Sequence, residues 1–319
     1  MSLSHFRMFS IAVGVLVFVS QPVTAISKSV TIWDDFIEDT TLRKGYTYLV
    51  AGVVHVPAGI KLTIEDGVTL YLKNGKIRPR VVDRAALIFD PGSLLEAESF
   101  TVKAAGADGR PEKKSDNGGI WFLGSVRDAS KDGVTVKSSS EPSSFSAEEI
   151  RVSHLGKLDP TPSPQSLNPR GDDLDAISVL GIGPKEWKIK KIQSDFSGDD
   201  GVDLTNSSIE LEEIQIFSPF EDGLNVSSSR LRVSKKLAVN MTKNLTVKDR
   251  DLFDLEVDDG PSYVTLAKGC KAELQGVFGD ELKLRSSDLP KPSDETNSLY
   301  RFQGFLKRGP ATIWSRTED

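Results

Sequence analysis

The residues best suited to chemistry are acids that recur in the middle of the chain. The segment DDGVDL at 199–204 returns as EDGLNV at 221–226, twenty-two residues later. Aspartates spaced in this way can bind a cation, transfer protons as a general acid and base, or form turns by accepting hydrogen bonds from nearby backbone amides. If twenty-two residues make one structural repeat, Asp200 and Asp222 lie about 5 Å apart at the same corner of neighbouring repeats.

A buried ladder of carboxylates at that spacing needs compensation. Two of them repel by about 3 kcal/mol at an effective dielectric constant of about 20. A cation, a shared proton or backbone donors can offset this repulsion, and Ca²⁺ suits an acidic corner because it takes six to eight oxygen ligands. A purely structural turn is the competing interpretation. The candidate metal ligands are Asp175, Asp200, Asp203 and Asp222, with Asp172, Asp173 and Asp199 as further candidates.

Short strands are expected to position these acids. Segments such as VTLYL (68–72) and SFTVKA (99–104) are rich in aliphatic residues and are separated by Gly, Pro or Asp, a composition typical of strands and turns. From Ile26 onward no segment has sustained helical periodicity, although WDDFIEDT (33–40) and DRDLFDL (249–255) are compatible with short helices. The chain is therefore predicted to be all-β.

The repeat indicates which β architecture is formed. WKIKKIQ (187–193) matches IELEEIQ (209–215) at a spacing of twenty-two, and DAISV (175–179) matches DGVDL of the first acidic segment at twenty-five. Nearer the N-terminus, LTIEDGVTL (62–70) aligns with LIFDPGSLL (87–95), again at twenty-five. A period of 22–25 residues built from strands predicts a solenoid whose coils stack about 4.8 Å apart.

These repeats resemble the right-handed parallel β-helix of the pectate-lyase-like superfamily. The likeness is carried by VPAGIKLTIEDGVTL (56–70), LIFDPGSLLEA (87–97), SGDDGVDLTNSSIEL (197–211) and EDGLNVSSSRLRV (221–233), and it extends over 47–260. The resemblance implies one β-helix domain whose ligand is a polysaccharide.

The flanking segments complete the predicted organisation. A short apolar run at 9–19 is followed by small residues up to Ala25, which is typical of a signal peptide and too short for a membrane span of about 20 residues. No later segment is long and apolar enough to span a membrane, so we expect a secreted, periplasmic or cell-surface protein. The predicted parts are a signal peptide at 1–25, an N-terminal cap at 26–46, the β-helix at 47–260, and a C-terminal cap with a flexible tail at 261–319.

The resemblance also suggests catalytic residues. Polygalacturonases of this fold use clustered aspartates that include an adjacent pair, one protonating the leaving oxygen while another activates water. Asp199 and Asp200 are similar to that pair, with Asp175 or Asp222 as a further partner. The Gly-His-Gly and Arg-Ile-Lys motifs of the polygalacturonases do not occur, and lyases of the superfamily use Ca²⁺ with an Arg or Lys base. Enzymatic activity, as a polysaccharide lyase or a glycoside hydrolase, therefore stays open.

Substrate-binding candidates surround the acidic corner. Trp187 follows a Gly-Pro insertion and is expected to offer an exposed platform for a sugar ring, while Arg170 and Lys190 supply positive charge. A loop with Arg110, Lys113 and Lys114 could contact an anionic glycan, although a solvated charged loop is the competing interpretation.

Composition narrows the functional classes. The formal net charge is −6, which argues against nucleic-acid binding, where a basic surface is expected. Cys270 is the single cysteine, so an intramolecular disulfide and a cysteine zinc site are excluded. Two classes remain: an exported protein that binds or cleaves an extracellular or envelope polysaccharide of acidic type, and a non-catalytic structural or adhesin-like surface protein.

Overall fold

The computed structural model describes most of the chain between Lys28 and Leu306. Within the described residues the chain forms strands and turns without any helix, so the all-β prediction is confirmed. Accordingly, none of these residues belongs to a helix that could cross a membrane. The predicted signal peptide and most of 261–319 lie outside the described residues. The described residues are 28–78, 81–124, 129–131, 134–136, 141–157, 174–242, 250–256, 259–260, 262–267, 269–275, 300–303 and 305–306.

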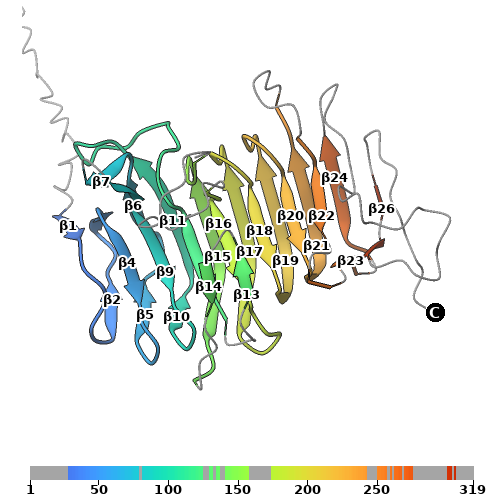
Figure 1. Ribbon diagram of the computed structural model, residues 1–319, viewed down its shortest axis with the longest axis horizontal. Coiled ribbons are helices and arrows are strands. Elements are labelled where there is room, and N and C mark those ends of the chain that lie inside the picture. Colours follow the sequence, from blue (N-terminus) through green and yellow to red (C-terminus); the bar gives the residue numbers. More distant parts are fainter. Residues whose placement is uncertain are drawn as a thin grey trace, which may run out of the picture.

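Two parallel sheets of fifteen and seven strands dominate the structure (Figure 1). The large sheet contains β1 (Lys28–Ile32), β2 (Thr40–Leu42), β3 (Tyr46–Val50), β5 (Lys61–Ile64), β6 (Val68–Lys73), β10 (Leu94–Ala97), β11 (Ser99–Ala105), β15 (Ser144–Ser153), β17 (Trp187–Asp195), β19 (Ser208–Phe217), β21 (Arg230–Asn240), β23 (Ser262–Leu266), β24 (Lys271–Gln275), β25 (Tyr300–Gln303) and β26 (Phe305–Leu306). The small sheet contains β4 (Val53–Val56), β9 (Ala86–Phe89), β12 (Ile120–Leu123), β16 (Ile177–Leu180), β18 (Val202–Thr205), β20 (Leu224–Ser227) and β22 (Phe253–Glu256). Two antiparallel hairpins join β7 (Lys76–Arg78) to β8 (Val81–Arg84) and β13 (Ala129–Lys131) to β14 (Val134–Val136).

The chain passes alternately through the two sheets. From β17 in the large sheet it enters β18 in the small sheet, then β19, β20 and β21 in turn. We call one passage through both sheets a coil. Each strand pairs in parallel with its counterpart in the preceding coil, and the strands lie side by side in colour order in Figure 1. This topology is consistent with a β-helical solenoid.

The predicted spacing is confirmed in the centre of the chain. Val202 pairs with Leu224, twenty-two residues later, and β17 and β19 have the same offset. Ser178 pairs with Asp203, twenty-five residues later. The acidic segments therefore occupy equivalent positions in neighbouring coils.

The predicted alignment of 62–70 with 87–95 is wrong. Leu62 pairs with Leu95 and not with Leu87, while Leu87 pairs with Val54, so these coils span thirty-three residues. The added length includes the β7–β8 hairpin, which lies between β6 and β9. The two aligned segments look alike because each is an aliphatic strand beside a glycine turn, which does not fix their register.

Neither predicted short helix forms. Residues 33–39 are irregular, and the backbone N–H of Phe36 donates to the carbonyl of His55 (2.9 Å). The described part of 249–255 contributes to β22, which pairs with β20. Phe253 and Leu255 point into the core, while Asp254 lies between them. This alternation has the period of a strand, not that of a helix.

One hydrophobic core is shared by both sheets. Aliphatic side chains occupy alternate positions of the strands, as in β6. Near the middle, the rings of Phe89 and Phe122 stack with centroids 5.0 Å apart. Phe145 and Trp187 approach Phe122 edge-on at 5.2 and 5.5 Å. This aromatic cluster joins the small sheet to the large one.

We predict that Phe122→Ala lowers the free energy of unfolding by about 3–5 kcal/mol, because it opens a cavity among three rings. Phe217→Ala is the matched control, since Phe217 is 37% exposed and its loss should cost less than about 1 kcal/mol. Urea denaturation measures both variants, and equal losses would contradict the assigned core.

Candidate functional site

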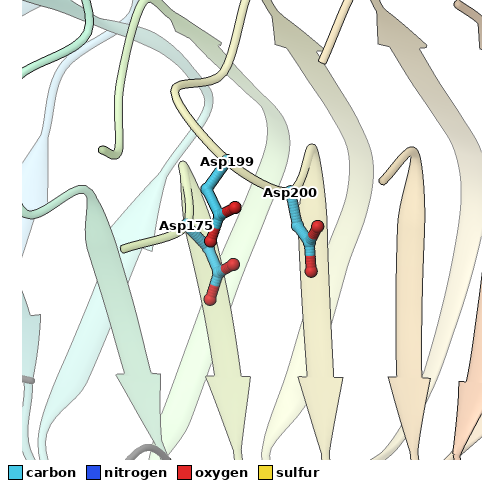
Figure 2. Close-up of side chains that lie close together, drawn as sticks. All are labelled: Asp175, Asp199 and Asp200. Carbon is cyan, nitrogen blue, oxygen red and sulfur yellow. The ribbon is translucent and has the colours of Figure 1, made fainter. Parts of the chain in front are cut away.

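Three aspartates converge where the chain enters the small sheet. Figure 2 shows Asp175 and Asp199 close together at the head of β16, with Asp200 beside them at the head of β18. One carboxylate oxygen of each residue lies within 4.8 Å of the others. The three residues are only 3%, 3% and 6% exposed. We call them the acidic trio.

In each acidic repeat a glycine follows the aspartate, and close packing requires a glycine there. A Cβ on Gly201 would lie 2.6 Å from the carbonyl oxygen of Gly223, and a Cβ on Gly223 would lie 2.6 Å from that of Leu252. Neighbouring coils therefore approach closely at this corner, and only glycine fits. The repeated Asp-Gly pattern thus reflects coil stacking as well as the chemistry of the acids.

The aspartates of this corner also bridge the coils. The backbone N–H of Asp222 donates to Asp200 Oδ1 (3.0 Å), and that of Asp251 donates to Asp222 Oδ1 (2.5 Å). Within one coil, the Ser178 hydroxyl donates to Asp175 Oδ2 (2.9 Å). Side chains that cap the backbone of the next coil support the interpretation as a structural turn.

The donor set also fits a hard cation. The trio offers carboxylate oxygens alone, which Ca²⁺ and Mg²⁺ prefer. Of the predicted ligands, Asp175 and Asp200 belong to the trio, whereas Asp203 and Asp222 do not. Asp199, predicted mainly as a catalytic residue, is the third member. Asp172 and Asp173 lie outside the described residues.

A second polar row lies on the small sheet. Asp203 pairs in register with Ser178, Asn225 pairs with Asp203, and Asp254 follows in β22. Asp203 and Asn225 thus lie side by side at the offset of the twenty-two-residue repeat. Asp203 is 0% exposed, so no large ligand reaches its side chain directly.

Asp222 is a buried carboxyl group with an altered affinity for protons. Burial raises its pKa to about 9; the backbone hydrogen bond from Asp251 lowers the pKa, and the charges of Asp254, Asp251 and Glu221 raise it again. Asp222 is therefore protonated near neutral pH, which removes one negative charge from the corner. The predicted catalytic role of Asp199, Asp200 and Asp222 stays a prediction, and their burial favours a structural or cation-binding role.

Of the predicted substrate-binding residues, Trp187 and Lys190 lie in the part of the chain that the structure describes. Trp187 is 6% exposed and packs against Phe122. The prediction that it offers an exposed platform for a sugar ring is therefore wrong. The reason is strand alternation, because Trp187 occupies an inward position of β17. Lys190 is exposed and pairs with Glu148 (2.5 Å). Arg170 lies outside the described residues.

A second candidate site lies on the outer face of the large sheet. A pocket of about 650 Å³ crosses β17, β19, β21 and β24. We call it the amide groove. Its amides come from Gln193 and Gln215, which are in register, and from Asn240 and Gln275, which are also in register. Asp195 is beside them and accepts a hydrogen bond from Gln193 (2.7 Å).

Two exposed aromatic rings border the amide groove. Phe196 is 41% exposed and Phe217 is 37% exposed, and their centroids are 5.2 Å apart at an interplanar angle of 85°. The sequence alone does not predict that these two rings are exposed, because a phenylalanine at the end of a strand usually belongs to the core.

The backbone holds this corner in an uncommon conformation. His154, Phe196 and Ser218 follow β15, β17 and β19 with φ of 57°, 56° and 53°. Positive φ is uncommon outside glycine and concentrates at functional sites. Each residue is fixed by its N–H, which donates to the next coil; Phe196, for example, bonds the carbonyl of Phe217 (2.8 Å). The backbone therefore holds the rings of Phe196 and Phe217 in fixed positions at the surface. We call these two rings and the turns that follow their strands the aromatic corner.

No family model, curated protein or solved structure gives a significant match to this chain.

We predict that Asp222→Asn weakens the pH dependence of stability. The folded protein keeps a proton that the unfolded chain loses near its ordinary pKa of 3.8, so stability falls as pH rises from about 4 to about 9. Asparagine retains the oxygen that accepts the Asp251 N–H and cannot ionise.

Thermal unfolding between pH 5 and pH 8 tests this prediction. The melting temperature of the wild type should fall more steeply than that of Asp222→Asn. Glu98→Gln, which changes an exposed acid between β10 and β11, is the control and should follow the wild type. Parallel curves for Asp222→Asn and the wild type would show that Asp222 is ionised in the folded state.

Proposed function

We propose that this chain is an exported right-handed parallel β-helix of the pectate-lyase-like kind that binds a polysaccharide along the amide groove. The parallel sheets and alternating topology support the fold. Location outside the cytoplasm, in the secreted, periplasmic or cell-surface space, follows from the signal-like sequence and remains part of the proposal.

The combination of amides with exposed aromatic rings in one groove supports glycan binding. Side-chain amides both donate and accept hydrogen bonds, as sugar hydroxyls require. Phe196 and Phe217 offer apolar faces on which the C–H surface of a sugar ring can pack. Because equivalent positions recur about every 4.8 Å across the sheet, the groove suits an extended chain better than a single small molecule.

A Ca²⁺ ion at the acidic trio is part of this proposal. An ion there would neutralise three carboxylates that otherwise repel one another in a buried corner. Asp175, Asp199 and Asp200 would hold it, and it would lock two coils together. The turn that carries Phe196 continues directly into Asp199 and Asp200, so the ion would also stiffen the aromatic corner.

A non-catalytic surface rod is the second candidate function. The bonds from Asp222 N–H to Asp200 and from Asp251 N–H to Asp222 favour it, because they give these acids a purely structural task. In that case the solenoid serves as a spacer or adhesive element, and the amide groove binds no glycan.

We predict that the protein is retarded in gels containing a polysaccharide from a panel of uronate-rich and neutral chains, and that Phe217→Ala weakens this binding about tenfold through loss of ring packing. Trp33→Ala is the control, because Trp33 is 56% exposed and does not line the groove. Absence of retardation throughout the panel, or equal loss in the control, would favour the rod.

The same panel separates binding from cleavage. New reducing ends, measured with and without Ca²⁺, report either hydrolysis or elimination. Their loss in Asp200→Asn would assign catalysis to the acidic corner, while binding without new ends would identify a binding protein.

We predict that millimolar Ca²⁺ raises the melting temperature of the wild type and leaves Asp199→Asn unchanged, because the variant lacks one of three ligands. Without Ca²⁺, Asp199→Asn should be at least as stable as the wild type, since it removes one repelling charge. Glu210→Gln, an exposed acid on β19, is the control. Calorimetry without heat and an unchanged melting temperature would leave the trio as a turn.

A further inference from the structure

A second pocket of about 610 Å³ adjoins the amide groove and shares Phe196 with it. Its walls come from five separate parts of the chain. Lys113, Lys114 and Ser115 lie on one side, and His154 and Lys157 lie beside the turn that begins at Phe196. We call it the lysine pocket.

Positive charge exceeds negative charge at this pocket. Asp116 pairs with Arg84 (2.8 Å), Lys157 (3.4 Å) and Lys114 (3.8 Å). Burial alone would raise the pKa of Asp116, but the hydrogen bond from Arg84 and the charge of Lys157 outweigh it and hold the pKa below its usual value. The carboxylate of Asp116 is thus the ion-pair partner of three cationic side chains. Among the described residues, Lys113 forms no ion pair.

The segment that carries the lysines is fastened to the aromatic corner. The Ser115 hydroxyl donates to the carbonyl of Phe196 (2.9 Å), and the amide of Asn117 donates to the carbonyl of His154 (3.2 Å). Asn74 donates to the carbonyl of Lys114 (2.7 Å). Asn117 is 0% exposed. These bonds hold the backbone of the lysine segment in place, so this backbone needs little ordering when a ligand arrives.

The aromatic side of the pocket is also fixed. The His154 ring stacks on Phe196 with centroids 4.9 Å apart and an interplanar angle of 19°. Burial lowers the pKa of His154, and the charge of Lys113 lowers it further. His154 is therefore neutral at pH 7, and the positive charge of the pocket comes from its lysines.

We infer that the lysine pocket binds an anionic substituent of a glycan, a carboxylate or a sulfate ester, while neighbouring sugars lie in the amide groove. The inference rests on the proposed function and adds a property that the amides do not supply, namely selectivity for charged over neutral chains. Lysine ammonium groups attract an anion, and the shared Phe196 connects that anion to the sugar rings in the groove.

Paired probes test the inference. Polygalacturonate is compared with its methyl ester, and a sulfated galactan is compared with its desulfated form, so that each pair differs in charge alone. The wild type should prefer one charged form, and the double variant Lys113→Gln/Lys114→Gln should bind that form about tenfold more weakly, as expected for two exposed ion pairs. Its binding of the uncharged partner should not change.

Lys185→Gln/Lys188→Gln is the matched control. Both lysines are exposed; Lys188 lies near the start of β17 and Lys185 lies just before it, whereas Phe196 follows the end of that strand. The control should keep the preference of the wild type. Raising the salt concentration should reduce the preference of the wild type and leave the pocket variant little changed. Melting temperatures establish that all variants are folded.

The outcomes separate this inference from the proposed function. If the wild type binds charged and uncharged forms equally, or if the pocket variant keeps the full preference, the inference is overturned while glycan binding stands. If the wild type binds none of the probes or the wider panel, glycan binding itself fails and the inference fails with it.

Discussion

The close stacking of parallel coils is the constraint on which the other features depend. At the acidic corner, neighbouring backbones approach so closely that Gly201 and Gly223 have no room for a side chain. The same approach brings Asp200 within hydrogen-bonding distance of the next backbone N–H. Stacking thus explains why Asp and Gly recur together, and it also concentrates carboxylates where water is scarce.

The two candidate sites are linked by one turn. Phe196 ends the large-sheet strand and is exposed, whereas Asp199 and Asp200 begin the passage to the small sheet and are buried. Burial makes the acidic trio unsuited to direct contact with a polymer, while exposure and fixed geometry suit the aromatic corner to it. The acidic trio therefore stabilises the turn between the two sheets, with or without Ca²⁺, and this turn holds the aromatic rings at the surface.

The sequence predicts how the central coils pair because the acidic motif occurs twice, once in each of two neighbouring coils. The twenty-two-residue offset of the acidic segments is the register in which β18 and β20 pair. The N-terminal register fails because the β7–β8 hairpin adds residues that no motif announces. The exposure of Trp187 is predicted wrongly because alternate residues of a strand face opposite sides of the sheet. A shift of one position exchanges the inner and outer faces. Phe196 escapes prediction because its exposure depends on the positive φ of the turn, which the residue type does not indicate. Phe217 escapes prediction because it occupies an outward position at the end of β19.

A crystal structure with a bound oligouronate tests the central claim most directly. We expect density for sugar rings against Phe196 and Phe217, with a carboxylate near Lys113 and Lys114 and hydroxyls near the amides of the groove. Sugar density over the small sheet, along Asp203 and Asn225, would contradict this account and return the functional site to the acidic face.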